Sequence, residues 1–341
     1  MRDGGGTVWI VVPGPITQTT GGYRYMAQLA RAMAAAGQTI RVAELPGRFP
    51  DPDAEAVAAA RAVADSLAPG DHLVIDGLAA LAFAAEPALA RALVLLHHPL
   101  HLETGLSAAA ARSLRAAEQG VLSHAARVVV TSPATRPDAV ALGVSPDRLT
   151  VALPGTDRLR GAKLRRRDTA LLLTVATVTP RKDHLTLIRA LQRLPGRWRW
   201  LALGSDCRDP AYARAVRAAV RTSGVARRCR VAGEVAPAGL ALAYRRAALF
   251  VLPSRHEGYG MAFAEALAAG LPVVAARAGA VPTTVPASAS RLARPGDAKG
   301  LRRALTDALR HRRRLTIAAH HAGQALPDWS DTARTVLGFL P

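Results

Sequence analysis

The sequence predicts an α/β protein built from two doubly wound domains, and three observations lead to this prediction. Half of the 341 residues are apolar, which is enough to form two hydrophobic cores. Short apolar runs alternate with helix-forming stretches, as in βαβ units. The alternation stops once, in the glycine-bearing and arginine-rich residues 154–168, and then restarts. This break is therefore interpreted as the linker between the domains.

Apolar runs of strand length predict a parallel sheet in the first domain. Its strands are expected at residues 7–12, 38–44, 72–76, 92–97, 127–131 and 149–153. Helices fill the intervals, most clearly at residues 53–67 and 107–123. Asp51-Pro-Asp53 has the D-x-D spacing found in some metal sites, but it precedes a helix and does not end an apolar strand. We therefore expect Asp53 to cap that helix and predict no metal site.

The second domain repeats the pattern. Its strands are expected at residues 170–176, 199–204, 230–233, 249–253 and 272–276. A final helix at residues 330–340 has no strand partner of its own.

The loop after the run at residues 249–253 carries the most informative polar residues. Gly258 and Gly260 let the main chain approach a ligand just before a helix at residues 261–269, whose N–H groups and dipole favour a phosphate. Glu257 and Glu265 are suited to accept hydrogen bonds from sugar hydroxyls. Taken singly, each glutamate is more often structural. Together with the strand, the glycine turn and Gly270-Leu-Pro-Val-Val274, they indicate a nucleotide-sugar site.

The segment from Glu257 to Val274 resembles the E-x(7)-E signature of the retaining family-4 glycosyltransferases. Pro180-Arg-Lys182, Gly233-Glu234, Gly279-Ala-Val-Pro282, Pro295-Gly-Asp297 and Leu326-Pro-Asp-Trp329 follow the family's usual order. The resemblance implies the GT-B fold, in which two Rossmann-like domains face each other across a cleft. It implies an acceptor-side domain at residues 1–158, a donor domain at residues 168–325, and a C-terminal helix at residues 326–341 that crosses back to the first domain.

The resemblance also implies a set of donor-binding residues. Arg181 and Lys182 lie beside a helix N-terminus, where cations and backbone donors can converge on a diphosphate. Thr177 stands where many members have an arginine, and Asp183 replaces a common glycine, but the lysine is retained. Gly21 and Gly22 form a weaker signal after the first strand, because a Gly-Gly pair is often only a tight turn. The expected donor site comprises Gly21, Gly22, Arg181, Lys182, Glu257, Gly258, Tyr259, Gly260, Met261 and Glu265.

Three histidines, His97, His98 and His101, follow the strand at residues 92–97. A metal site is not favoured, because neighbouring side chains of a strand point to opposite faces and we expect no acidic or cysteine partner near them. By resemblance, one histidine at this point contacts a sugar hydroxyl or the acceptor. We favour His98.

Composition limits the partners and the compartment. The formal charge of +20 attracts anions, namely nucleoside diphosphates, acidic acceptors or an anionic membrane surface. The basic runs at residues 158–167 and 310–314 are not interleaved with aromatic residues, so nucleic acid is not the expected partner. No apolar run reaches the length of a membrane span, and two cysteines without a C-x-x-C motif indicate neither disulfide nor zinc. We expect a cytoplasmic protein, with contact to an anionic membrane left open.

The sequence thus predicts a retaining glycosyltransferase that uses a nucleoside-diphosphate sugar, UDP-linked before GDP-linked, and transfers the sugar to an acceptor hydroxyl. Neither a metal nor another cofactor is expected. The residues expected to act in catalysis are His98, Lys182 and Glu257. Two alternatives stay open. One is a catalytically silent GT-B subunit, suggested by Thr177 and Asp183, and the other is a basic nucleic-acid-binding protein, suggested by charge alone.

Overall fold

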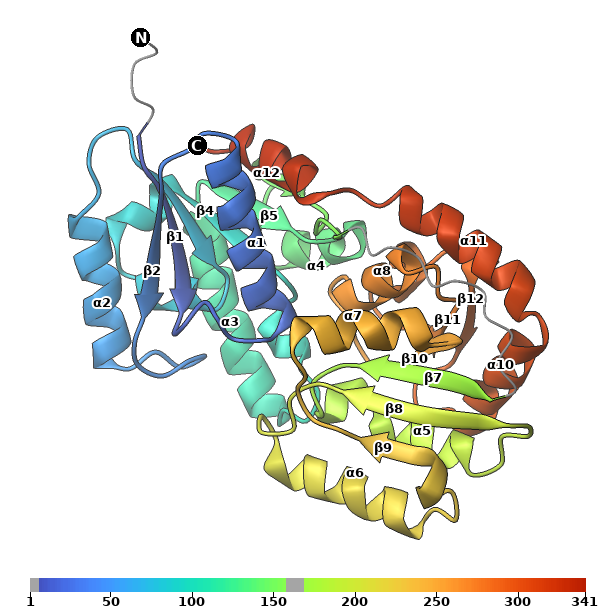
Figure 1. Cartoon of the computed structure of the whole chain (residues 1–341). Helices are drawn as coiled ribbons and strands as arrows, with labels where there is room; N and C mark the ends of the chain where they lie inside the picture. The colour runs from blue at the N-terminus through green and yellow to red at the C-terminus, as the bar shows by residue number, and fades with distance from the viewer. Residues whose placement is uncertain (1–5, 158–168) are drawn as a thin grey trace. The chain divides into compact units, whose positions relative to one another are not determined.

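The computed structural model describes residues 6–157 and 169–341. The chain forms two compact units, one of Met1–Gly155 with Pro327–Pro341 and the other of Thr156–Leu326. Each unit contains a six-stranded parallel sheet with helices packed against it (Figure 1). The predicted two-domain α/β fold is thereby confirmed. Most of the predicted linker, at residues 158–168, lies outside the described residues.

The sheet of the first unit has the strand order β2-β1-β3-β4-β5-β6. Its strands are β1 (Val8–Pro13), β2 (Ile40–Leu45), β3 (His72–Asp76), β4 (Ala92–Leu96), β5 (Arg127–Val130) and β6 (Leu149–Val151). The interior strands β1 and β4 are buried along their whole length, as expected for continuous apolar runs covered on both faces. The chain winds from β1 to β2 in one direction and through β3 to β6 in the other. The carboxyl ends of β1 and β3 therefore form a topological switch point.

The helices of the first unit connect these strands. They are α1 (Gly21–Ala35), α2 (Ala54–Asp65), α3 (Ala108–His124) and α4 (Arg136–Ala141), with 3-10 turns η1 (Ala79–Phe83), η2 (Pro87–Arg91), η3 (Leu100–Leu102), η4 (Pro133–Thr135) and η5 (Pro146–Arg148). Asp53 is the N-cap of α2, and its Oδ1 accepts a hydrogen bond from Ala56 N at 3.1 Å. This confirms the capping role expected of Asp53, a contact typically worth about 1 kcal/mol.

The C-terminal helix α12 (Trp329–Leu337) belongs to the first unit, where it packs beside α1. The buried Tyr25 of α1 makes an edge contact with Trp329, with ring centroids 5.6 Å apart. Gly155 allows the close approach, because a Cβ at this position would lie 2.4 Å from Trp329 N. Thr332 Oγ1 also donates to Leu153 O at 2.8 Å. The last helix therefore completes the core of the unit in which the chain began.

The sheet of the second unit has the order β12-β11-β10-β7-β8-β9. Its strands are β7 (Ala170–Val175), β8 (Trp198–Leu203), β9 (Cys229–Val231), β10 (Leu249–Leu252), β11 (Val273–Ala276) and β12 (Ser290–Ala293). The sequence predicts the first five of these but not the edge strand β12, because Ser-Arg-Leu-Ala is not an apolar run. The winding reverses between β7 and β10, so their carboxyl ends form the switch point of this sheet.

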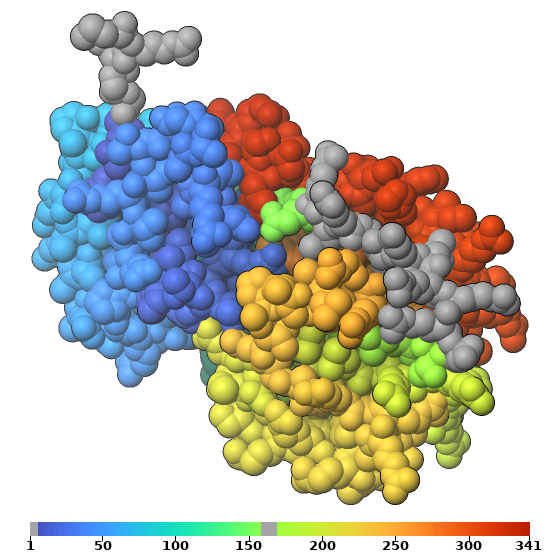
Figure 2. All heavy atoms as spheres, viewed as in Figure 1, coloured from blue at the N-terminus to red at the C-terminus, as the bar shows by residue number. Residues whose placement is uncertain are grey.

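Helices cover both faces of the second sheet, and the sheet separates the hydrophobic core of this unit into two clusters. They are α5 (His184–Leu191), α6 (Pro210–Thr222), α7 (Pro237–Arg246), α8 (Met261–Ala268), α9 (Val281–Thr284), α10 (Ala298–Arg310) and α11 (Arg312–Gln324), with η6 (Pro180–Lys182), η7 (Ala226–Arg228) and η8 (Ala287–Ala289). Neighbouring residues of β7 point into different clusters, Leu172 into one and Leu173 into the other. Figure 2 shows the outer surface formed by the atoms of each unit. The sheet thus carries a hydrophobic cluster on each face, and the loops at its strand ends extend from this packed core.

Candidate functional site

The candidate site of the second unit lies at its topological switch point. β10 pairs with β7 in parallel, with Leu249 opposite Leu172 and Phe250 opposite Leu173. The turn η6 follows β7, and the loop at residues 254–260 follows β10. Because parallel neighbours end at the same sheet edge, residues about 75 positions apart in sequence come into contact there.

Lys182 and Glu257 make the central contact of this edge. Lys182 Nζ lies 2.6 Å from Glu257 Oε1, and Arg181 Nη1 lies 3.7 Å from Glu257 Oε2. The side chains of Lys182 and Arg181 are 15% and 20% exposed, whereas that of Glu257 is 6% exposed. The predicted residues Arg181, Lys182 and Glu257 are therefore brought together by the fold.

The charge of Glu257 depends on its two cationic neighbours. Burial would raise the pKa of the Glu257 carboxyl, but the Lys182 and Arg181 cations outweigh it and hold that pKa below its ordinary value. Glu257 is accordingly ionised at neutral pH. The group carries two positive charges against one negative charge, which suits it to hold a further anion beside the carboxylate.

The backbone of Glu257 is held by the loop that follows β11. Ala280 N donates to Glu257 O at 2.8 Å. Gly279 has φ 51°, and a Cβ there would lie 2.3 Å from Glu257 O. Only glycine fits this approach without moving the glutamate. Gly279 is therefore part of the support of the site, a role that the sequence reasoning did not assign to it.

The N-terminus of α8 lies just after Glu257. Gly260 is its N-cap with φ 86°, and no side chain caps the helix among the described residues. The Tyr259 backbone oxygen accepts from Thr284 Oγ1 at 2.7 Å, and burial raises the pKa of the Tyr259 phenol to about 12. The amides of the first turn and the helix dipole make this end of α8 suitable for a phosphate.

Glu265, the second predicted glutamate, lies inside α8 and is 7% exposed. Its Oε2 accepts a hydrogen bond from the hydroxyl of the buried Tyr244 at 2.8 Å. Tyr244 belongs to α7, and nothing in its local sequence distinguishes it from a core tyrosine. The contact orients a carboxylate that has little access to solvent.

In the first unit, the predicted glycines and histidines lie near the ends of β1, β3 and β4. Gly21 and Gly22 open α1, and a Cβ on Gly22 would lie 3.1 Å from His97 Cδ2. His97 Nε2 is 3.1 Å from Asp76 Oδ2 at the end of β3. His97, not the favoured His98, is thus the histidine that lies beside Gly22 at the start of α1.

The other two histidines pair with glutamates nearby. His98 Nε2 lies 3.2 Å from Glu103 Oε2, and His101 Nδ1 lies 2.8 Å from Glu118 Oε2. In the described parts of the chain, no group of three or more histidine, cysteine, aspartate or glutamate side chains has a geometry that could hold a metal ion.

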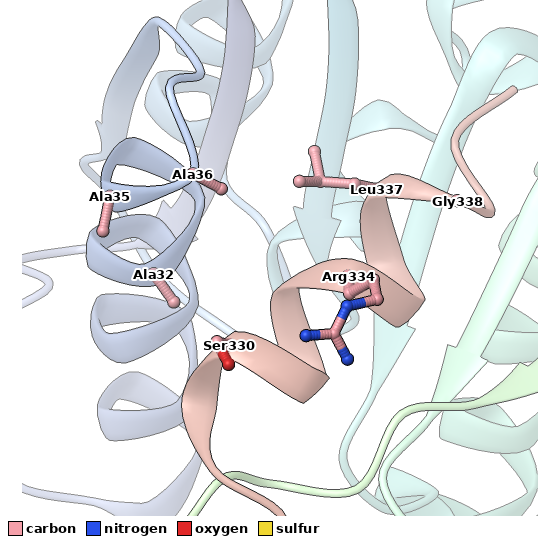
Figure 3. Close-up of a pocket in the computed structure, with 7 residues that line it drawn as sticks. All are labelled: Ala32, Ala35, Ala36, Ser330, Arg334, Leu337 and Gly338. Carbon is pink, nitrogen blue, oxygen red and sulfur yellow. The ribbon is translucent and has the colours of Figure 1, made fainter.

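A separate pocket of about 730 Å³ lies between α1 and α12 of the first unit. Figure 3 shows its lining residues, which are Ala32, Ala35, Ala36, Ser330, Arg334, Leu337 and Gly338. Arg334 is paired with Asp331, and the remaining lining is small or apolar. Lacking a carboxylate or histidine in its lining, this pocket is not the candidate site.

Comparison with known proteins identifies the class to which this architecture belongs. Sucrose-phosphate synthase from Thermosynechococcus elongatus matches with a TM-score of 0.86 at 20% identity, over 98% of both chains. HepE of Anabaena, solved in complex with UDP and glucose, matches with a TM-score of 0.79 at 16% identity, over 98% of this chain and 99% of that chain. At these identities the likeness establishes the fold, and the chain has the fold of the GT-B glycosyltransferases.

The sequence comparison is more specific for the second unit. Residues 169–311 match the family described as glycosyl transferases group 1. The D-inositol 3-phosphate glycosyltransferase of Thermobifida fusca is 32% identical over 224 residues, which cover 57% of this chain and 50% of that protein. The matched region spans half or less of the length of such curated relatives. The second unit is therefore similar to the group 1 glycosyltransferases over residues 169–311, and the whole chain's reaction is a proposal. Within residues 6–157 and 169–341, no helix is both long and apolar enough to cross a bilayer.

Proposed function

We propose that this chain is a retaining glycosyltransferase that moves a sugar from a nucleoside-diphosphate donor to an acceptor hydroxyl. The observation that carries the proposal is the Lys182–Glu257 contact of 2.6 Å at the switch point of the unit that is similar to the group 1 glycosyltransferases. The contact places cations that suit a diphosphate, Lys182 and its neighbour Arg181, beside the Glu257 carboxylate, which suits sugar hydroxyls.

The proposed mechanism assigns each group a role. As the glycosidic bond breaks, negative charge develops on the departing diphosphate. Arg181, Lys182 and the amides from Gly258 to Met261 stabilise that charge, and such preorganised donors make the largest single contribution to many enzymatic rates. Glu257 binds hydroxyls of the donor sugar, and Glu265 binds the ribose end of the nucleotide. Same-face attack by the acceptor, held in line with the donor, retains the anomeric configuration.

One structural match supports UDP as the donor nucleotide, ahead of GDP. HepE of Anabaena was solved with UDP and glucose, and its fold matches this chain over nearly its whole length.

The names of the curated relatives include D-inositol 3-phosphate, so phosphorylated polyols should be among the acceptors tested. The net charge of +20 suits acidic acceptors and motivates the further proposal of contact with an anionic membrane. On this proposal, Gly21 and Gly22 contact the donor phosphate, a histidine after β4 contacts a sugar hydroxyl or the acceptor, and the reaction needs no metal.

The test is a thermal-shift and turnover assay with UDP, GDP, ADP and their sugars. A ligand at one hundred times its dissociation constant stabilises the fold by about 2.7 kcal/mol. We expect Lys182→Ala and Glu265→Ala each to lower turnover by about two powers of ten. The exposed Lys299 of α10 provides the matched control, and Lys299→Ala should keep full activity. Full activity of a folded Lys182→Ala would refute the assignment.

The same assay addresses the alternative of a silent GT-B subunit. A protein that is stabilised by a nucleotide sugar, but neither hydrolyses it nor transfers the sugar to any acceptor, fits that alternative. Retention is checked separately, by the anomeric configuration of the first product in an NMR spectrum.

A further inference from the structure

Asp183, the residue after Lys182, adopts an unusual backbone conformation. Its φ of 49° and ψ of 46° lie in the left-handed region, and it is the one residue other than glycine with positive φ in the part of the chain that the structure describes. Side chains disfavour this region, although aspartate tolerates it better than most. A conformation of this kind persists when the surrounding contacts hold it in place.

The carboxylate of Asp183 supplies two of these contacts. It is 4% exposed, its Oδ1 accepts from Thr186 N at 3.3 Å, and its Oδ2 accepts from Arg255 Nε at 3.1 Å. The first contact caps α5. The second contact, with Arg255, connects Asp183 to the loop after β10. Capping of α5 does not require this contact.

The two loops are also joined through Arg181, the residue before Lys182. Arg255 N donates to Arg181 O at 2.7 Å, and Arg181 Nη1 donates to His256 O at 3.2 Å. Lys182 lies in the chain between Arg181 and Asp183, and its Nζ meets Glu257 Oε1. The Asp183–Arg255 ion pair is thus a further side-chain connection between the turn that carries Lys182 and the loop that carries Glu257, beside the contacts of Arg181 and Lys182 themselves.

We infer that Asp183 and Arg255 are positioning residues, which act together to direct the Lys182 ammonium at Glu257. This inference rests on the proposed function for its catalytic consequence but not for its structural one. Arg255 is half-exposed, so solvent screens its side of the ion pair and moderates what the pair contributes to folding. In the site, the ion pair fixes the positions of the two loops relative to each other. This affects the reaction because a small displacement of a reacting or binding group lowers the rate by up to about 100-fold.

The first test reads the position of Lys182 without any reaction. The chain contains only three lysines, so labelling one side-chain carbon of every lysine with carbon-13 yields three NMR signals. The signal that disappears in Lys182→Arg is that of Lys182. We expect Arg255→Ala and Asp183→Gly each to move the Lys182 signal toward that of the exposed Lys299, which should itself stay unchanged. Asp183→Gly keeps the left-handed conformation free of strain and removes only the carboxylate contacts. A Lys182 signal unmoved in both folded variants overturns the inference.

The second test is a double-mutant cycle on turnover. Arg255→Ala should lower kcat/KM by about 10-fold to 100-fold in the native protein, and by less than 3-fold when Lys182 is already alanine. Arg255→Lys, which keeps one charged donor for Asp183, should restore part of the loss. An equal loss in both backgrounds would mean that Arg255 touches the donor itself, and this would overturn the positioning role. If the native protein neither binds a nucleotide nor transfers a sugar, the proposed function fails, whereas the lysine spectra still decide the positioning.

Discussion

The hydroxyl of Tyr244 donates a hydrogen bond to Glu265 Oε2 at 2.8 Å, and both side chains are buried. This contact links α7, which precedes β10, to α8, which follows it. This hydrogen bond fixes the position of one carboxylate oxygen of Glu265 and thereby also the direction of the other oxygen. Glu265 is therefore ordered before any ligand arrives, which reduces the entropy cost of binding.

Tyr244→Phe removes this hydrogen bond and leaves the ring in place. Hydrogen bonds to charged groups contribute about 1.5–3 kcal/mol, so we expect a loss of this size in the free energy of unfolding. The affinity for UDP should also fall, because Glu265 loses its orientation. Chemical denaturation and UDP titration measure the two effects. Tyr212→Phe is the control, since the Tyr212 hydroxyl accepts hydrogen bonds from the backbone, from Leu185 N at 3.5 Å and from His184. Unchanged UDP affinity in Tyr244→Phe would contradict the role given to Glu265.

Gly279→Ala should displace Glu257. The added Cβ would lie 2.3 Å from Glu257 O at a backbone φ of 51°. Gly196→Ala is a matched control, because Gly196 has φ 88° but nothing within 4 Å of the new Cβ. Both variants bear the strain of a left-handed alanine, about 1–2 kcal/mol. Only Gly279→Ala should in addition weaken donor binding, which a thermal-shift titration with the nucleotide sugar detects. Equal donor binding by the two variants would show that Gly279 does not support the site.

Alanine substitution distinguishes the two neighbouring histidines. His97 touches Gly22 and pairs with Asp76, whereas His98 pairs with Glu103. We expect His97→Ala to lower turnover by at least 10-fold more than His98→Ala, given the usual worth of a positioned acid–base or hydrogen-bonding group. Steady-state rates with saturating donor provide the comparison. A larger loss in His98→Ala would restore the assignment favoured by the sequence.

His184 should make the fold sensitive to acid. Burial, with a smaller effect of the Lys182 charge, lowers the pKa of His184 from 6.5 to about 4. The folded protein therefore binds fewer protons than the unfolded chain between these values, so its stability falls as pH drops through this window. The shift corresponds to about 3 kcal/mol, lost by pH 4.

Denaturation of His184→Leu at pH 7 and pH 4.5 measures this contribution. The variant should lose much less stability than the native protein over the same interval. His321→Leu, at an exposed position of α11, corrects for general effects of removing a histidine. Equal acid sensitivity of all three proteins would exclude His184 as the cause.

Much of the fold and part of the site follow from local patterns in the sequence. Apolar runs such as Leu249–Leu252 mark buried strands, and glycines after a strand mark the loops where such sheets bind ligands. Lys182 and Glu257 could be predicted because each follows a strand of this kind. The edge strand β12 could not, because its residues are partly polar and only its neighbour β11 defines it.

The contacts that hold the site depend on which strands become neighbours. Asp183 and Arg255 are 72 residues apart, and their pairing requires the adjacency of β7 and β10. Tyr244 and Glu265 lie on different helices, and the sequence places neither against the other. The choice between His97 and His98 likewise depends on the direction of one side chain at the end of β4. Such details are set by tertiary packing, which no local pattern encodes.

The return of α12 to α1 makes the first unit discontinuous in sequence, with Thr156–Leu326 inserted between its two parts. During synthesis the ribosome must complete the inserted unit before Trp329 can reach Tyr25. This face of α1 therefore stays uncovered until Pro327–Pro341 has been synthesised. Removal of Pro327–Pro341 would leave Thr156–Leu326 intact but expose the Tyr25 face, which makes this segment a determinant of the first unit's solubility.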